Sequence, residues 1–173
     1  MPRFSRIPLR PAAVLGCVLI SLSAGAAWNA AAAESGPFTG FNGRWSGSGV
    51  IRVKDDNKQT TERVRCQATY RHSGSYDVGL RLGCKSDSYK FDLTGNFEAD
   101  PNNTVSGRWS EETHNIGGTA VGVARGDRLR IHAEGSAFSA ELNMVTHSHR
   151  QSVQLDSRGA GKRMTASITL RRD

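Results

Sequence analysis

Two histidines separated by one residue, His147 and His149 in "VTHSHR", are a pair whose type and spacing suit metal binding. On a β-strand, side chains two residues apart point to the same side, so both imidazoles can reach one Zn²⁺ or Cu²⁺ ion. A stable site needs further ligands, and His72, His114 and His132 are scattered along the chain. We therefore interpret the pair as two solvated histidines at the end of a strand, and we predict neither a bound metal nor another cofactor.

The sequence lacks the common catalytic patterns. Serines are numerous, but no Gly-x-Ser-x-Gly nucleophile elbow occurs, and "GAGKR" at residues 159–163 lacks the spacing of a phosphate-binding loop. The carboxylate pairs Glu111–Glu112 and Asp55–Asp56 lie in polar, turn-like stretches, where solvation is the ordinary explanation. We predict that the protein is not an enzyme.

Arginines form a second pattern that can do chemistry. Many of them fall opposite the apolar positions of the alternating segments described below. Guanidinium groups on neighbouring strands can hold phosphate or carboxylate groups through paired hydrogen bonds. The candidate anion-binding wall consists of Arg63, Arg65, Arg81, Arg128 and Arg130. The alternative is an ordinary charged surface, because acidic residues are interspersed among these arginines.

The first 33 residues have the composition of a secretory signal peptide. Three arginines and no acid precede an apolar stretch, which ends in small residues suited to a cleavage site. We predict cleavage near Ala33/Glu34 and Sec-type export to the periplasm or beyond. A membrane anchor is one alternative, but about 17 apolar residues diluted by glycine and serine are short for a span. Lipoprotein processing at Cys17 is another, which we disfavour because most of the apolar run follows that cysteine.

Removal of residues 1–33 leaves 140 of the 173 residues, which suits a single domain. We divide it into an N-terminal extended segment at 34–43 and a β-barrel domain at 44–173, with no membrane span. The net charge falls from +7 to +4, because the leader carries three arginines and no acid. We exclude nucleic acid as a partner, since the aromatic residues that would stack on bases are not interleaved with the basic ones.

Two cysteines, Cys66 and Cys84, remain after cleavage. An even pair in an oxidising compartment predicts a structural disulfide. The alternatives are a redox pair or two metal thiolates, but the sequence has neither a Cys-x-x-Cys motif nor a matching second pair of ligands.

Alternation of apolar and polar residues dominates the chain after residue 44. In residues 127–134, Leu129, Ile131 and Ala133 share one face, whereas charged side chains and a histidine occupy the other. Residues 62–71, 76–85 and 88–97 repeat this pattern, which is typical of half-buried antiparallel strands. Turn residues separate the segments every 8–12 residues or so. We predict strands that begin near residues 45, 61, 76, 88, 104, 116, 127, 138, 150 and 163.

These short connections predict an all-β protein: a single small antiparallel up-and-down barrel of about 8–10 strands, closed so that no edge stays exposed. The inward aromatic residues can either fill such a barrel or line a cup. Trp109, inward on a middle strand, is expected to fill the interior.

The first predicted strand begins with Gly43-Arg44-Trp45, and the chain ends with Arg171, Arg172 and Asp173. A Gly-x-Trp at this position resembles the calycin superfamily, which includes the lipocalins. That resemblance implies that Trp45 closes one end of the barrel beneath an arginine near the end of the last strand. Such a stacked cation–π contact is worth about 1 kcal/mol. We therefore assign Gly43, Trp45, Arg171 and Arg172 to barrel closure.

A broader likeness covers most of residues 41–172, through "GRWSGSG", "ERVRCQATY", "LGCKSDSYKFDL" and "SGRWSEET". These stretches resemble a group of small, uncharacterised exported proteins of alphaproteobacteria. The resemblance implies a compartment and a fold, and it carries no catalytic residue.

Two functions follow as hypotheses. The first is a non-enzymatic barrel that binds a small apolar or anionic ligand, or an envelope lipid or polysaccharide, and serves envelope maintenance. The second is a periplasmic inhibitor of a protease or lysozyme. "SGSY" at 73–76 resembles, with one residue fewer, the Ser-Gly-x-x-Tyr loop of lysozyme inhibitors. Residues 34–43 can act as an inserting arm, as in metalloprotease inhibitors, or as a lid on the barrel.

The leader generates the first testable prediction. We expect the protein purified from its own host to begin near Glu34, without lipid on Cys17, as checked by intact-mass spectrometry of the envelope fraction. A protein that retains residues 1–33 would favour the membrane anchor. A mass that corresponds to a chain beginning at a diacylated Cys17 would favour the lipoprotein.

Overall fold

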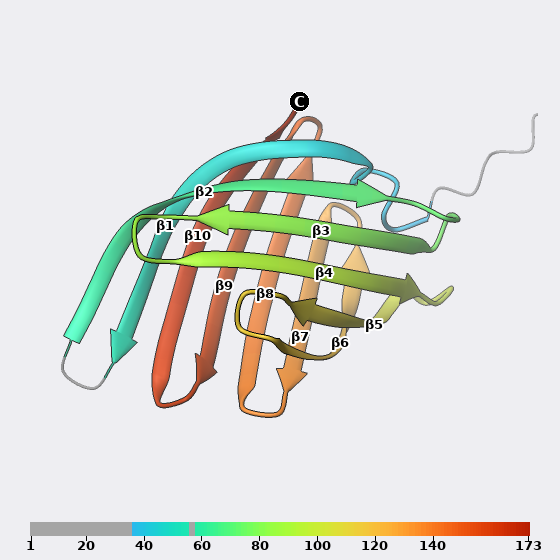
Figure 1. Cartoon of the computed structure of the whole chain (residues 1–173). Helices are drawn as coiled ribbons and strands as arrows, with labels where there is room; N and C mark the ends of the chain where they lie inside the picture. Colours follow the sequence, from blue (N-terminus) through green and yellow to red (C-terminus); the bar gives the residue numbers. More distant parts are fainter. Residues whose placement is uncertain (1–35, 56–57) are drawn as a thin grey trace, which may run out of the picture. The chain divides into compact units, whose positions relative to one another are not determined.

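The computed structural model describes residues 36–55 and 58–173, which form a closed barrel of ten antiparallel strands (Figure 1). The strands are β1 Gly43–Asp55, β2 Lys58–Arg71, β3 Asp77–Lys85, β4 Lys90–Ala99, β5 Thr104–Glu111, β6 Ile116–Arg125, β7 Arg128–Gly135, β8 Phe138–His147, β9 Arg150–Gly159 and β10 Lys162–Arg172. Each strand pairs with the next, and β10 pairs with β1 to close the barrel. The predicted up-and-down barrel is confirmed. The leader, its cleavage site and Cys17 lie outside the described residues.

Alternation of side chains builds the barrel wall. In β2, Val64, Cys66 and Ala68 are buried, whereas the intervening Arg65 and Gln67 are exposed. A similar alternation is found in β6 and β8, because successive side chains of a strand point to opposite faces of the sheet. No helix among the described residues is long and apolar enough to cross a membrane.

The seam between β1 and β10 depends on two glycines. A Cβ atom added to Gly47 would lie 2.0 Å from the carbonyl oxygen of Thr169, and one added to Gly49 would lie 2.1 Å from that of Ser167. No side chain fits at such a distance. Glycine therefore allows the tight curling of β1 against β10, the last pairing needed to close the barrel.

Alternate hairpins lie at opposite ends of the barrel (Figure 1). One end, which we call the closed end, carries the segment before β1, the C-terminus and the β2–β3, β4–β5, β6–β7 and β8–β9 turns. The other end, which we call the mouth, carries the β1–β2, β3–β4, β5–β6, β7–β8 and β9–β10 turns. The β1–β2 hairpin projects beyond β3 at the mouth, because β2 meets β3 only from Arg65 to Arg71.

The disulfide predicted from the cysteine count is confirmed. Cys66 on β2 and Cys84 on β3 lie directly opposite each other and are bonded, with 4.1 Å between their Cα atoms. Both side chains point inward, so the bond crosslinks two neighbouring strands from inside the barrel.

Loss of this crosslink should destabilise the fold. We expect the Cys66→Ala/Cys84→Ala variant to unfold with a free energy lower by about 3 kcal/mol, because closing an 18-residue loop restricts the unfolded chain. Urea denaturation followed by circular dichroism measures the change. Dithiothreitol should destabilise the wild type similarly and leave the variant unchanged; an equal effect on both would contradict the assignment.

Candidate functional site

The interior of the barrel contains a cavity of about 390 Å³. Inward side chains from all ten strands line it, and most of them are aliphatic or aromatic. Known small-molecule sites have volumes of about 300–1,000 Å³ and mainly apolar walls. The inward aromatic residues therefore line a cup and do not fill the barrel.

A row of small side chains leaves this space open. Ala120 on β6 lies opposite Ala133 on β7, which lies opposite Ala140 on β8, which in turn lies opposite Ser157 on β9. All four line the cavity. Four consecutive strands thus present almost no side-chain volume at one level of the barrel.

Trp45 plugs the closed end. Its side chain is fully buried, and its indole Nε1–H donates a hydrogen bond to the carbonyl oxygen of Phe41 at 2.7 Å. The guanidinium carbon of Arg172 lies 4.7 Å from the centre of the Trp45 ring, within cation–π range, and the same guanidinium donates to the carbonyl oxygen of Gly40. Of the two C-terminal arginines, Arg172 covers the indole, whereas Arg171 is exposed.

The segment before β1 folds over this end as a lid. Residues 37–41 form successive turns, in which the Phe41 N–H donates to the carbonyl oxygen of Phe38 at 2.8 Å. The Phe38 and Phe41 rings are buried, and Phe41 packs edge-on against Tyr70 with 5.5 Å between ring centres. Gly43 then begins β1 with a φ of 110°, a conformation that favours glycine. The prediction of an extended segment at 34–43 is wrong for its described part, because burying two phenylalanines requires a compact turn.

Beneath the lid, three polar side chains form a buried chain of hydrogen bonds. The Tyr70 hydroxyl donates to Gln151 Oε1 at 2.9 Å, and Gln151 Nε2 donates to Thr146 Oγ1 at 3.0 Å. Burial raises the pKa of Tyr70, although its bond to Gln151 opposes this. The phenol therefore stays neutral, and the floor of the cavity carries no charge from it.

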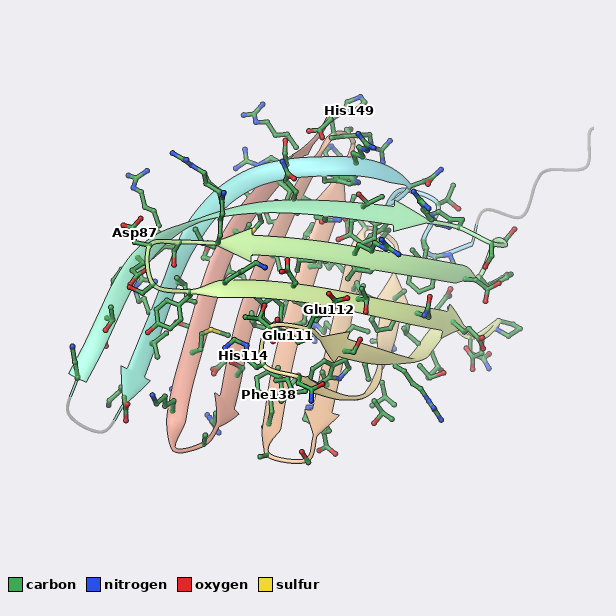
Figure 2. All side chains as sticks on the ribbon, viewed as in Figure 1. Asp87, Glu111, Glu112, His114, Phe138 and His149 are labelled. Atoms are coloured by element: carbon green, nitrogen blue, oxygen red, sulfur yellow. A yellow bond between two sulfur atoms is a disulfide. The ribbon has the colours of Figure 1, made fainter. Side chains whose placement is uncertain are left out.

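A buried carboxylate organises the opposite end. Glu111 is 1% exposed and accepts hydrogen bonds from the backbone N–H groups of Asp92 (2.8 Å), Thr113 (2.9 Å) and His114 (2.8 Å), and its Oε2 lies 2.6 Å from His114 Nδ1. Burial raises its pKa, but these four hydrogen bonds outweigh burial and lower it to about 2. Figure 2 labels Glu111 and His114, whose side chains make the 2.6 Å contact. The interpretation of Glu111 as a solvated residue is wrong, because the carboxylate holds the β5–β6 turn against β4.

Lys162 stands on the rim of the cavity, on the side formed by β1 and β10. It occupies an inward position of β10, with Met164 and Ala166 farther in, and it lines the cavity while remaining exposed to solvent. Its Nζ lies 3.1 Å from Oδ2 of Asp55, the residue opposite it on β1. By contrast, Leu170 and Tyr70, which line the other end of the cavity, are buried. The cavity thus reaches solvent at the mouth.

The five arginines of the candidate wall all lie on the outer face, but they do not lie together. Arg63 and Arg65 on β2 and Arg81 on β3 are on neighbouring strands, whereas Arg128 and Arg130 are on β7. Three strands, β4, β5 and β6, separate β3 from β7 on one side of the ring, and four separate β2 from β7 on the other. A single wall is therefore ruled out by the order of the strands.

The two histidines of "VTHSHR" do not share a strand face. His147 is the last residue of β8, and His149 lies in the turn before β9, near the closed end in Figure 2. Ser148 has a φ of 50°, so the chain reverses between them, and both histidines are exposed. The expectation of two imidazoles on one strand is wrong for this reason. Within residues 36–55 and 58–173, no group of three or more His, Cys, Asp or Glu side chains could hold a metal ion.

Trp109 lies inward on β5, as its alternation predicts. Its indole N–H donates to the carbonyl oxygen of Thr119 at 3.1 Å, and its ring packs at 5.5 Å from that of Phe138. It lines the cavity near the mouth, so it forms wall and does not occlude the interior.

Solved structures with the same fold differ strongly from this chain in sequence. The S-type phycobiliprotein lyase CPES from Guillardia theta superposes with a TM-score of 0.59 at 11% identity, over 79% of this chain and 90% of the lyase. Rv2717c from M. tuberculosis superposes with a TM-score of 0.61 at 15% identity, over 79% of this chain and 94% of that protein. This chain has a calycin-like fold. Identities this low show the fold alone, and no protein-family model and no curated protein sequence matches the chain.

Sequence reasoning missed two features of the site. Glu111 continues the inward series Val105, Gly107 and Trp109, so alternation alone could have placed it inside the barrel. The row of small side chains had no comparable signal, because alanines on different strands meet only once the register between those strands is known.

The Glu111 carboxylate should make stability depend on pH. We expect Glu111→Gln to lower the free energy of unfolding at pH 7 by about 2 kcal/mol, because an amide cannot accept from all these donors. Because the folded pKa lies below the ordinary 4.5, this contribution is complete above pH 4.5 and is lost as the pH falls through about 2. Urea denaturation between pH 7 and 2 should therefore show the wild type and variant converging. Glu112→Gln, at the exposed neighbour, should change little; equal losses in both variants would contradict this role.

Proposed function

We propose that the protein binds a small, largely apolar molecule inside its barrel. The observation that carries this proposal is the cavity of about 390 Å³, which has an apolar wall, a closed floor and a solvent-exposed mouth. Water in an apolar space of this kind makes few hydrogen bonds, so a hydrophobic ligand replaces it favourably.

Small side chains in the barrel wall keep the cavity open. The row of Ala120, Ala133, Ala140 and Ser157 holds one level of the barrel open. The lid, Trp45 and the Tyr70–Gln151–Thr146 chain close the floor, so a ligand enters and leaves at the mouth. A preformed, concave and mainly apolar site is typical of proteins that bind small molecules.

The proposal also includes the cellular compartment in which the protein acts. The predicted leader and the disulfide favour an exported protein of the cell envelope. The resemblance to small exported alphaproteobacterial proteins is consistent with this proposal. In that compartment a barrel of this kind can carry or sequester a lipid-like molecule and thereby serve envelope maintenance. Ligand binding of this sort needs no catalytic residue.

The inhibitor hypothesis relied on residues 34–43 as an arm and on "SGSY" at 73–76. The structure favours the lid, because Phe38 and Phe41 are buried in the barrel end. Gly36 packs against the backbone of Ser75, so the two features lie against each other. An arm would have to leave this packed arrangement before it could insert into another protein, and we therefore propose ligand binding alone.

Filling the row of small residues tests the proposal. We expect the wild type to bind Nile red, a neutral dye whose emission rises in apolar surroundings, and Ala133→Phe to weaken binding about tenfold or more by occupying the cavity. Fluorescence titration measures both affinities. Thr119→Phe, on the outer face of β6, is the matched control and should bind as the wild type does. Equal affinities in all three proteins would overturn binding inside the barrel.

A further inference from the structure

We propose that the ligand is an amphiphile with one anionic head group, a carboxylate, which Lys162 binds at the mouth while the hydrocarbon part occupies the cavity. This inference rests on the proposed function and adds to it the chemical class of the ligand and its orientation. Its structural basis is the position of Lys162, its partner and the distribution of charge around the mouth.

Lys162 combines an inward register with access to solvent. It continues the inward series Met164, Ala166 and Ile168 of β10, so its aliphatic stem belongs to the apolar wall. The residue paired with Lys162 on β9 is Gly159, which also lines the cavity and adds no side chain beside the ammonium group. A hydrocarbon chain in the cavity would therefore pass directly beneath a positive charge on leaving it.

The contact with Asp55 leaves this charge available. The Lys162 and Asp55 side chains are 55% and 48% exposed, and the 3.1 Å contact between them is an exposed ion pair, a class that contributes little to stability. An ammonium group has three N–H donors, and Asp55 Oδ2 occupies one of them. A ligand carboxylate can accept from another without displacing Asp55.

The other ionisable residues on the cavity lining are placed differently. Lys90 alternates with the inward Phe91, so its side chain leaves the outer face of β4, where its ammonium lies 2.7 Å from the carboxylate of Asp92. His114 has its Nδ1 at 2.6 Å from the buried carboxylate of Glu111. At the floor, the Tyr70 hydroxyl donates to Gln151 and carries no charge. The polar end of a ligand therefore belongs at the mouth, and the apolar end belongs at the floor.

Charge at the mouth is divided between its two sides. Apart from Lys162, the described residues at 54–55, 58 and 156–163, in the β1–β2 and β9–β10 hairpins, include four basic and two acidic side chains. Residues 85–92 and 111–114, in the β3–β4 and β5–β6 hairpins across the mouth, carry two basic and four acidic side chains. Figure 2 labels three of these acids, Asp87, Glu111 and Glu112. An anionic head group is thus attracted to the side of Lys162 and repelled from the opposite side.

Three probes with one hydrocarbon chain and different head groups test this assignment. Dodecanoate, dodecan-1-ol and dodecylammonium would each displace Nile red from the purified protein at low salt and pH 7.5, below their micellar concentrations. We expect dodecanoate to bind about fivefold more tightly than the alcohol, the upper end for an exposed ion pair, and dodecylammonium to bind more weakly than the alcohol. Lys162→Gln should abolish the preference for dodecanoate, so that this variant binds dodecanoate no more tightly than the alcohol.

The matched control is Lys54→Gln. Lys54 lies on the same rim, and its substitution removes the same charge. However, Lys54 alternates with the inward Val53 and Asp55, so its exposed side chain lies on the outer face of β1. It should retain the preference for dodecanoate. Equal binding of the three probes, a preference for dodecylammonium, or the same loss in both variants would overturn the head-group assignment and leave the cavity proposal standing. Failure of all three probes to displace the dye from the wild type, or failure of the dye to bind, would overturn the proposed function itself.

Discussion

The width of the barrel is the constraint on which the rest of this structure depends. Eight strands enclose an interior just wide enough for inward side chains to fill, whereas this barrel closes with ten. Ten strands leave central space that their own side chains do not reach, and the row of Ala120, Ala133, Ala140 and Ser157 enlarges it. The cavity therefore follows from the number of strands together with small residues at one level of the wall.

The two ends of the barrel differ in the side chains that cover them. At the closed end, aromatic side chains exclude water: Trp45 lies between the lid and the interior, and Arg172 covers its ring. At the mouth, charged side chains such as Lys162 and Asp55 are exposed, and the buried carboxylate of Glu111 fixes the β5–β6 turn by accepting from three backbone N–H groups. The two ends of the interior therefore differ chemically, with neutral groups at the floor and ionic groups at the rim.

Much of the wall could be predicted because alternation is a local property. The inward positions of β2 and β3, and with them the facing of Cys66 and Cys84, follow from period-two patterns within single strands. Predictions that required knowing which strands are neighbours fared worse. The candidate arginine wall is split between β2–β3 and β7, and the two histidines of "VTHSHR" are separated by a turn at Ser148. Alternation specifies a face of a strand, and it does not specify where that strand lies around the ring.

The sequence by itself determined the all-β class, the approximate number of strands and the disulfide pair. These depend on residue order along the chain and on the two cysteines that follow the predicted leader. The pairing of Trp45 with a C-terminal arginine was predicted from the resemblance to the calycins. Only the tertiary structure decided whether the aromatic residues fill the barrel or line it, where Lys162 and Glu111 lie relative to the cavity, and that residues 37–41 form a lid. Each of these depends on register and closure, which bring together residues far apart in the chain and which no single strand encodes.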